Sequence, residues 1–183
     1  MKTKTFLFLG IFLICAVSIC AKVNLTSYKI HLVESQKGEY QCLPCGRDCD
    51  NAIYKGPGTC PHCNMKLVKK STVTFKTIQP SVLCKYITAH PNVVLLDVRT
   101  KEEFEGKANP NFGTLKNAIN LPIQELESKI STLNSLKGKE IIVYCSHSHR
   151  SPQASYILTQ NKFTNVTNMA GGMSVLKDNS CKK

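Results

Sequence analysis

From residue 72 onward, short apolar runs rich in β-branched residues alternate with segments whose apolar positions recur at helical spacing. The run 93–98 is almost unbroken, as expected for a strand that is buried on both faces. Apolar positions between 123 and 136 recur every three or four residues, which predicts a helix that ends before Gly138. The other predicted strands are 72–78, 118–121, 141–144 and 165–169, and the other predicted helices are 80–90, 101–104 and 152–160.

This alternation predicts an α/β fold with a doubly wound, mostly parallel sheet and helices on both of its faces. In such sheets the functional site lies at the carboxyl ends of the strands. Asp97 and Cys145 each fall at the end of a predicted strand. Both side chains are therefore expected at the same edge of the sheet.

Residues 1–71 lack the alternation and divide into three parts. Residues 1–20 resemble a signal peptide, because Lys2 and Lys4 precede an apolar stretch that ends in small residues. The same segment resembles a bacterial lipoprotein signal in which Cys20 carries the lipid, and an uncleaved anchor is a further alternative. Residues 21–39 form a polar linker, residues 40–70 a small cysteine-rich module, and residues 72–183 the α/β domain.

The net charge of the chain limits the classes of molecule that we expect it to bind. Its 183 residues carry a net charge of +12, and removal of residues 1–20 takes away two lysines and no acid, which leaves 12 − 2 = +10. Basic residues are spread along the chain and are not interleaved with aromatic residues in one patch. We therefore expect attraction to small anions or to a membrane surface, and no nucleic-acid partner. The expected location is the periplasm, with membrane attachment through the N-terminus as an alternative.

The segment 141–152 carries the strongest chemical signal. An apolar stretch ends at Cys145, a polar loop follows, and Arg150 closes the loop before Ser151 and Pro152, which are predicted to start a helix as its N-cap and first residue. Backbone N–H groups of such a loop converge at the positive end of a helix dipole, which favours a thiolate and a bound anion. The alternative is a buried cysteine beside a solvated basic loop. The residues predicted to bind the substrate are Ser146, His147, Ser148, His149 and Ser151.

Three further motifs accompany this loop in a fixed order. Residues 97–104 have the sequence DVRTKEEF, residues 113–122 have GTLKNAINLP, and residues 168–173 have NMAGGM. With the loop, these motifs make residues 72–178 resemble a single rhodanese domain. The resemblance implies a sulfurtransferase in which Cys145 takes a sulfane sulfur, for example from thiosulfate, and passes it to a thiol or cyanide without a cofactor. It implies that Cys145 and Arg150 are catalytic and that Asp97, Arg99 and Glu103 support the loop.

The length of the loop and three differences from the usual family pattern refine the resemblance. Four residues separate Cys145 from Arg150. Rhodanese-like sulfurtransferases have this shorter loop, whereas the related dual-specificity phosphatases have one residue more, so the count favours sulfur over phosphate. Ser148 stands where the family usually has glycine, and a positive φ there would strain the backbone. Thr114 replaces the usual histidine, and the tryptophan expected after Gly172 is absent.

The cysteine-rich module has the spacing of a metal site. Two C-x-x-C knuckles are separated by fourteen residues, and four thiolates in this arrangement suit tetrahedral zinc. The module also resembles the short heavy-metal-binding domain of metal-handling proteins, so another soft metal such as Cu(I) is an alternative, and two disulfides are another. Cys49 and His62 are spare donors. The predicted ligands are Cys42, Cys45, Cys60 and Cys63.

Two functional hypotheses follow. The first is an exported sulfurtransferase of the rhodanese type that carries a metal-binding module. The second is an exported metal-handling or sulfur-relay binding protein whose rhodanese domain is weakly active or inactive. A disulfide oxidoreductase is disfavoured, because Cys145 has no partner in a C-x-x-C motif.

Overall fold

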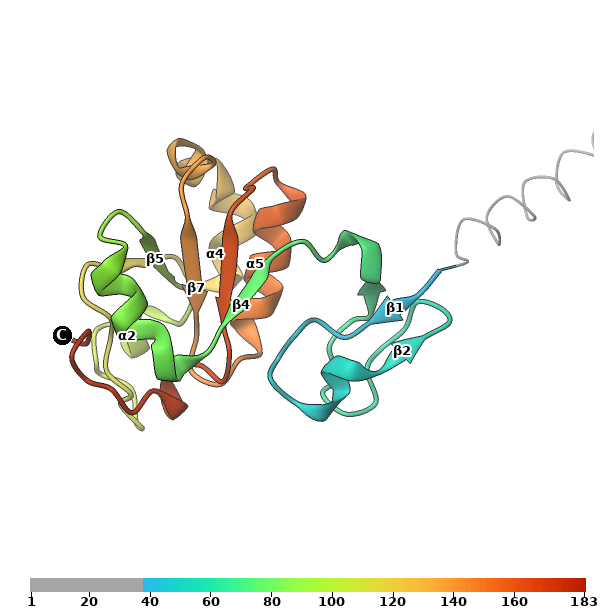
Figure 1. Cartoon of the computed structure of the whole chain (residues 1–183), viewed down its shortest axis with the longest axis horizontal. Coiled ribbons are helices and arrows are strands. Elements are labelled where there is room, and N and C mark those ends of the chain that lie inside the picture. Colours follow the sequence, from blue (N-terminus) through green and yellow to red (C-terminus); the bar gives the residue numbers. More distant parts are fainter. Residues whose placement is uncertain (1–37) are drawn as a thin grey trace, which may run out of the picture. The chain divides into compact units, whose positions relative to one another are not determined.

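The computed structural model describes residues 38–183 (Figure 1). The predicted signal peptide, with the lipidation candidate Cys20, and the predicted linker up to residue 37 lie outside the described residues. Within residues 38–183, no helix combines the length and apolar character needed to cross a membrane.

Five parallel strands form the main sheet, in the order β4-β8-β7-β5-β6. Asp97 pairs with Tyr144 in the register of β5 and β7, so the chain leaves both strands at the same edge. The predicted α/β class with a parallel sheet is confirmed. The strands are β4 (Lys76–Ile78), β5 (Val94–Asp97), β6 (Ile119–Asn120), β7 (Ile141–Tyr144) and β8 (Val166–Met169).

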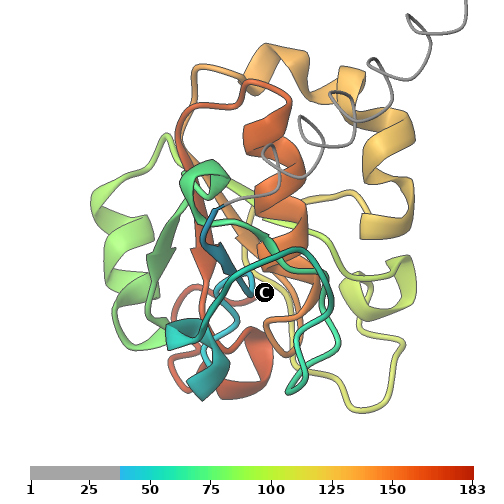
Figure 2. The same ribbon diagram turned by 90° about the vertical axis from the view of Figure 1, so that its right-hand side faces the viewer.

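Helices cover both faces of this sheet. Figure 2 shows α2 (Pro80–Ala89) on one side and the pair α4 (Ile123–Lys129) and α5 (Arg150–Gln160) on the other. Val143 of β7 belongs to the apolar cluster on the side of α4 and α5, and Ile142 to the cluster on the side of α2. All four residues of β7 are buried, which explains why this strand is an unbroken apolar run.

Three predicted elements differ from the structure. The predicted strand 72–78 is reduced to β4, because its first part forms the 3₁₀ helix η2 (Lys70–Thr72) and an extended connection. The predicted helix 123–136 is α-helical only in α4 and continues as the 3₁₀ helix η3 (Ile130–Leu136). The predicted start of the helix at Pro152 is wrong: α5 begins at Arg150, because His149 already has helical dihedral angles and is the N-cap.

The cysteine-rich module forms a three-stranded antiparallel sheet in the order β2-β1-β3. Its buried cluster holds only three residues that are not cysteines, Tyr40, Met65 and Leu67. A module with so small a core needs a metal ion or disulfides to fold. The elements are β1 (Tyr40–Gln41), η1 (Asp48–Asn51), β2 (Ile53–Tyr54) and β3 (Val68–Lys69).

A disulfide closes the C-terminal end of the chain. Cys84 of α2 is bonded to Cys181, at a sequence separation of 97. Figure 1 shows the carboxyl terminus beside α2. The final residues also pair with the segment before β6: the N–H of Lys116 donates to the carbonyl of Cys181, and that of Lys183 to the carbonyl of Thr114. The C-terminus is therefore held at two points of the α/β domain.

Candidate active site

Cys145 lies directly after β7, at the edge of the sheet that also ends β5. Its side chain is only 1% exposed, and its Sγ donates a hydrogen bond of 3.4 Å to the hydroxyl of Ser151. Ser151 is the second residue of α5 and is fully buried. The prediction that Ser151 caps the helix is wrong. The helix starts two residues earlier than predicted, at Arg150, and this leaves the hydroxyl of Ser151 free to face the sulfur.

The loop 146–149 follows Cys145, and its backbone N–H groups are not engaged in hydrogen bonds within the described residues. These N–H groups precede the N-terminus of the eleven-residue helix α5. A loop of this kind offers several donors and a helix dipole to an anion.

Glu103 anchors the loop to the short helix α3 (Lys101–Phe104). Its carboxylate accepts bonds of 2.5 and 2.8 Å from the two terminal nitrogens of Arg150, and one of 2.6 Å from the hydroxyl of Ser146. Arg150 thus pairs with Glu103 in bidentate geometry, which is the strong form of this interaction. The guanidinium of Arg150, opposed by burial and helped by Ser146 and Thr100, lowers the pKa of Glu103 to about 2. Both groups are therefore charged at neutral pH.

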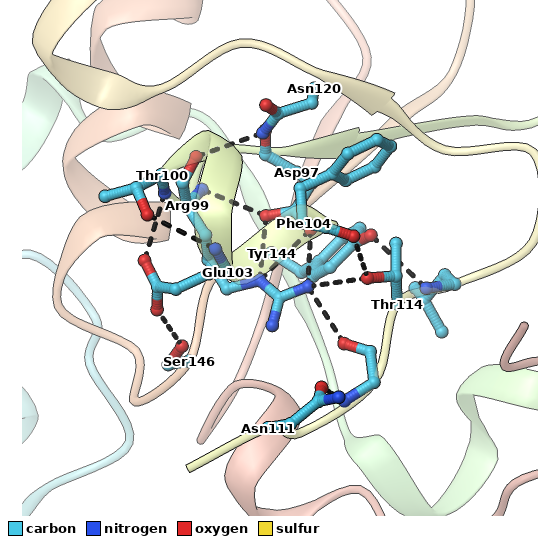
Figure 3. A network of polar contacts seen from close by, with 12 residues as sticks. Asp97, Arg99, Thr100, Glu103, Phe104, Asn111, Thr114, Asn120, Tyr144 and Ser146 are labelled. Atoms are coloured by element: carbon cyan, nitrogen blue, oxygen red, sulfur yellow. Dashed lines mark hydrogen bonds and ion pairs between the residues drawn. The ribbon is translucent and has the colours of Figure 1, made fainter. Parts of the chain in front are cut away.

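The capping of α3 fixes the position of Glu103. The hydroxyl of Thr100 accepts from the N–H of Glu103, and the carboxylate of Glu103 accepts from the N–H of Thr100, which is a capping box. Figure 3 shows Glu103 between Thr100 and Ser146. A helix of only four residues is held in this way at the point where it meets the loop 146–149.

Asp97 and Arg99 form a buried ion pair beneath this region (Figure 3). Their side chains are 0% and 1% exposed, and the guanidinium of Arg99 makes three hydrogen bonds of 2.7–3.0 Å to the carboxylate. Arg99 also donates to the carbonyl of Gly113 and to the hydroxyl of Thr114, which itself donates to the carbonyl of Phe104. The pair therefore joins the end of β5 to the segment before β6 and, through Thr114, to α3.

Ser148 has a φ of +60°, so the strain expected at this position is present. Its side chain is fully buried, and its Oγ has no hydrogen-bond partner among the described residues. Placing a residue that has a Cβ in the left-handed region costs about 1–2 kcal/mol of folding free energy.

The two histidines of the loop differ in their exposure to solvent. His147 is exposed, and its ring lies edge-to-face with that of Phe112, with the two ring centroids 5.2 Å apart. His149 is the half-buried N-cap of α5.

Gly172 and the turn after it support the backbone of the loop from below, a role that was not predicted from the sequence. A Cβ at Gly172 would lie 2.5 Å from the carbonyl of Ser146, so only glycine fits. The N–H of Met173 donates to the carbonyl of Cys145 (2.8 Å), and that of Ser174 to the carbonyl of Ser146 (3.0 Å). The paired glycines of the NMAGGM motif were the signal for this contact.

The cysteine-rich module gathers four thiols whose Sγ atoms all lie within 4.8 Å of one another. Two of the separations are 3.1 Å, between Cys42 and Cys63, and 3.7 Å, between Cys45 and Cys49. Both are shorter than the distance of about 3.8 Å between the sulfur atoms of tetrahedral zinc with Zn–S bonds of about 2.3 Å, and no separation in the group exceeds 4.8 Å, so the group could hold a metal ion of this kind. The group consists of Cys42, Cys45, Cys49 and Cys63.

Cys60, a predicted ligand, lies beside this group, and Cys49 takes its place within it. Cys60 is fully buried, and its Sγ lies 3.9 Å from the hydroxyl of Tyr54. Burial acts to raise the pKa of Cys60, but backbone N–H donors at His62 and Cys63 outweigh it and lower the pKa to about 6. Burial raises the pKa of Cys42. The module thus holds five cysteines for the four positions of a tetrahedral ion.

The Rhodanese-like domain family matches residues 83–179, which include Asp97, Glu103, Cys145 and Arg150. The chain belongs to the rhodanese-like family. This rhodanese-like protein is 33% identical to the thiosulfate sulfurtransferase PspE of Escherichia coli over 78 residues, which cover 43% of this chain and 68% of PspE. It is 30% identical to a tRNA uridine(34) hydroxylase of Cytophaga hutchinsonii over 115 residues, 61% of this chain, and spans only 35% of that hydroxylase.

The fold is also found in a solved structure, and a second one is similar in sequence. The crystal structure of SSP1007 from Staphylococcus saprophyticus superposes with a TM-score of 0.50 at 24% identity, covering 60% of this chain and all of SSP1007. A rhodanese-related protein from Thermoplasma volcanium is 30% identical, with a TM-score of 0.46, and the match covers 56% of this chain and 90% of the other. The cysteine-rich module lies before the residues that the family matches.

Proposed function

We propose that this protein is a sulfurtransferase that carries a sulfane sulfur as a persulfide on Cys145. The observation that carries the proposal is the position of Cys145 between the end of β7 and α5, inside a loop whose amide groups are not used by the fold. The identity to PspE over most of that enzyme supports the same substrate class, a small sulfur-containing anion such as thiosulfate.

The reaction has two half-reactions. The Cys145 thiolate attacks the outer sulfur of thiosulfate, the S–S bond breaks, and sulfite leaves with the electron pair. A thiol or cyanide then attacks the outer sulfur of the persulfide, which forms a new persulfide or thiocyanate and returns the Cys145 thiolate. The loop N–H groups and the Ser151 hydroxyl stabilise the sulfur anions, and Arg150, held by Glu103, keeps the loop in place.

Intact-mass analysis and thiocyanate formation test this proposal together. The protein is incubated with thiosulfate and weighed, then given cyanide, and Cys145→Ser is the comparison. We expect one added sulfur atom and turnover in the wild type and neither in the variant. Circular dichroism and metal content show that the variant is folded. Turnover that persists in Cys145→Ser would assign the chemistry to another group.

The alternative function is a sulfur-relay or metal-handling binding protein. Two observations favour it: Cys145 is 1% exposed, and Ser148 strains the catalytic loop. In that case the mass experiment gives a sulfur adduct, or none, without turnover. The persulfide on Cys145 would then be transferred to a specific partner protein and not to free cyanide.

We further propose zinc as the ion of the cysteine cluster. Four buried or half-buried thiols at these separations are the donor set of structural zinc. Zinc binding of this kind stabilises a module that is too small to fold through its own core. Metal analysis of the purified protein should give one zinc per chain. Replacement by cobalt should give a visible thiolate-to-metal band, and replacing Cys49 should remove both signals if it is a ligand. The same experiment with Cys60→Ser decides which of the two completes the site.

An exported location remains a proposal that rests on residues 1–20. The Cys84–Cys181 disulfide supports it, because such bonds persist in oxidising compartments. Fractionation of cells that produce the full chain, followed by mass determination of its N-terminus, tests export, cleavage and lipidation in one experiment.

A further inference from the structure

The segment 43–46 of the cysteine-rich module touches the α/β domain at the edge where the catalytic loop lies. The carbonyl of Pro44 accepts a 3.2 Å hydrogen bond from the side chain of Asn168, near the end of β8. Gly46 faces the turn that follows β8, since a Cβ on it would lie 3.6 Å from the N of Gly171. The side chain of Leu43 is 4% exposed and belongs to the apolar cluster that contains Cys145.

That turn is in direct contact with the active site. Gly172 packs on the backbone of Ser146, and Met173 donates to the carbonyl of Cys145. The contacts therefore run from the module through residues 168–173 to the catalytic loop. Cys145 is only 1% exposed, so a donor or acceptor molecule can reach its sulfur only if some of the residues around it move.

The cysteine cluster holds both ends of the segment. Cys42 and Cys45, two members of the group of four thiols, flank Leu43 and Pro44 in the sequence. The carboxylate of Asp50 also accepts from the N–H groups of Cys45 and Gly46. An ion that binds Cys42 and Cys45 would fix the two residues between them, and its loss would free them.

We propose that segment 43–46 is a lid that sets which sulfur compounds reach Cys145, with the metal-binding cysteines as its anchor. The proposal rests on the proposed role of Cys145 as the nucleophile. Small anions such as thiosulfate pass the closed lid during brief openings, whereas bulky donors and acceptors require the lid to be displaced. Occupancy of the cysteine cluster by metal thereby determines the size range of the substrates.

The test is the rate at which Cys145 is alkylated, because it needs no turnover. The zinc-loaded full chain is treated with iodoacetamide or with the larger N-ethylmaleimide, and modification of Cys145 is followed by peptide mass spectrometry. In Leu43→Ala we expect the rate constant with N-ethylmaleimide to rise by about tenfold or more, and that with iodoacetamide to rise less. Zinc content should stay at the wild-type value.

Leu133→Ala is the matched control. Leu133 is 5% exposed and belongs to the same apolar cluster, but it lies in η3, which precedes the amino end of β7. We expect its alkylation rates to stay close to the wild type. Equal acceleration in both variants would mean general loosening of the core and would overturn the lid.

Removal of zinc from the wild type is the second test of the lid, and it replaces the first if Leu43→Ala does not fold. A chelator should raise the alkylation rate of Cys145 with the same preference for the larger reagent. An unchanged rate after complete loss of zinc would overturn the proposal. A protein that passes both tests but forms no thiocyanate from thiosulfate would keep the lid and lose the sulfurtransferase assignment, so the two failures are distinguishable.

Discussion

Glu103 is the residue through which α3 holds Ser146 and Arg150, and its ionisation makes these contacts depend on pH. Its pKa in the folded protein is about 2, below the ordinary value of 4.5, mainly because of Arg150. The charged carboxylate therefore stabilises the fold fully above about pH 4.5, and this contribution is lost as the pH falls toward 2. Its size, after allowance for solvent screening, is about 1–2 kcal/mol.

We expect Glu103→Gln to be less stable than the wild type at pH 7 by about 1–2 kcal/mol and to match it near pH 2. Urea unfolding at several pH values between 2 and 7 measures the difference. Glu125→Gln is the control, since Glu125 makes only an exposed pair with Lys129 and should change little at any pH. Parallel stability curves for Glu103→Gln and the wild type would contradict the prediction.

Ser148 offers a second prediction at this scale. Replacement by glycine removes both the strain of a φ of +60° and a buried hydroxyl without a partner. We expect Ser148→Gly to be more stable by about 1 kcal/mol, which corresponds to a rise in Tm of about 2–4 °C. Calorimetry measures it. Asn117→Gly is the comparison: Asn117 has a similar φ of 59° but is exposed, and asparagine tolerates this region, so its gain should be smaller. A lower Tm for Ser148→Gly would show that the hydroxyl stabilises the loop.

The sequence was sufficient to place Cys145 directly after a buried strand and Glu103 in the short helix 101–104, because both segments could be recognised from local patterns. The contact between Cys145 and Ser151 was not predictable, because it depends on a helix start that differs by two residues from the expected one. The sequence offered Cys49 only as a spare donor, and its position beside Cys45 was not predictable, since the turn of η1 is needed to bring the two sulfur atoms together. Local spacing indicates the donors, and only the folded chain selects among them.

At the scale of elements, the split of the predicted helix 123–136 had a signal in the sequence. Ile123, Leu126 and Ile130 are spaced by three and four residues, as in an α-helix. Ile130, Leu133 and Leu136 are spaced by three, which is the repeat of the 3₁₀ helix that the structure has there. The Cys84–Cys181 bond had no local signal, because its partners are separated by 97 positions and meet only when α2 and the C-terminus are both in place.

That disulfide is expected to control the C-terminal element. Replacing both Cys84 and Cys181 by alanine removes a link across a long loop and should lower the free energy of unfolding by about 2–5 kcal/mol. In hydrogen exchange, the amides of Lys116 and Lys183, which pair the C-terminus with the segment before β6, should lose protection first. Wild-type protein with a reducing agent should behave like the double variant. If the variant keeps both the stability and these protected amides, the hydrogen bonds alone hold the C-terminus.

At the scale of the whole molecule, the protein joins two parts that are stabilised in different ways. The α/β domain has two extensive apolar clusters, one on each face of its sheet, whereas the buried cluster of the module consists largely of cysteines. Loss of metal should therefore affect the two parts unequally, because binding free energy replaces the missing core only in the module.

We expect a chelator to abolish hydrogen-exchange protection in β1, β2 and β3 while the amides of β5, β7 and β8 stay protected, and zinc to restore the module. The change in far-ultraviolet circular dichroism should be small, since the module contains no α-helix in the described part of the chain. Cys84→Ala with Cys181→Ala is the converse case, in which the C-terminus loosens and the module stays protected. If chelation instead unfolds the five-stranded sheet as well, the module is an integral part of the α/β core. Its contacts through Leu43 and Pro44 would then have to contribute more stability than two buried side chains ordinarily do.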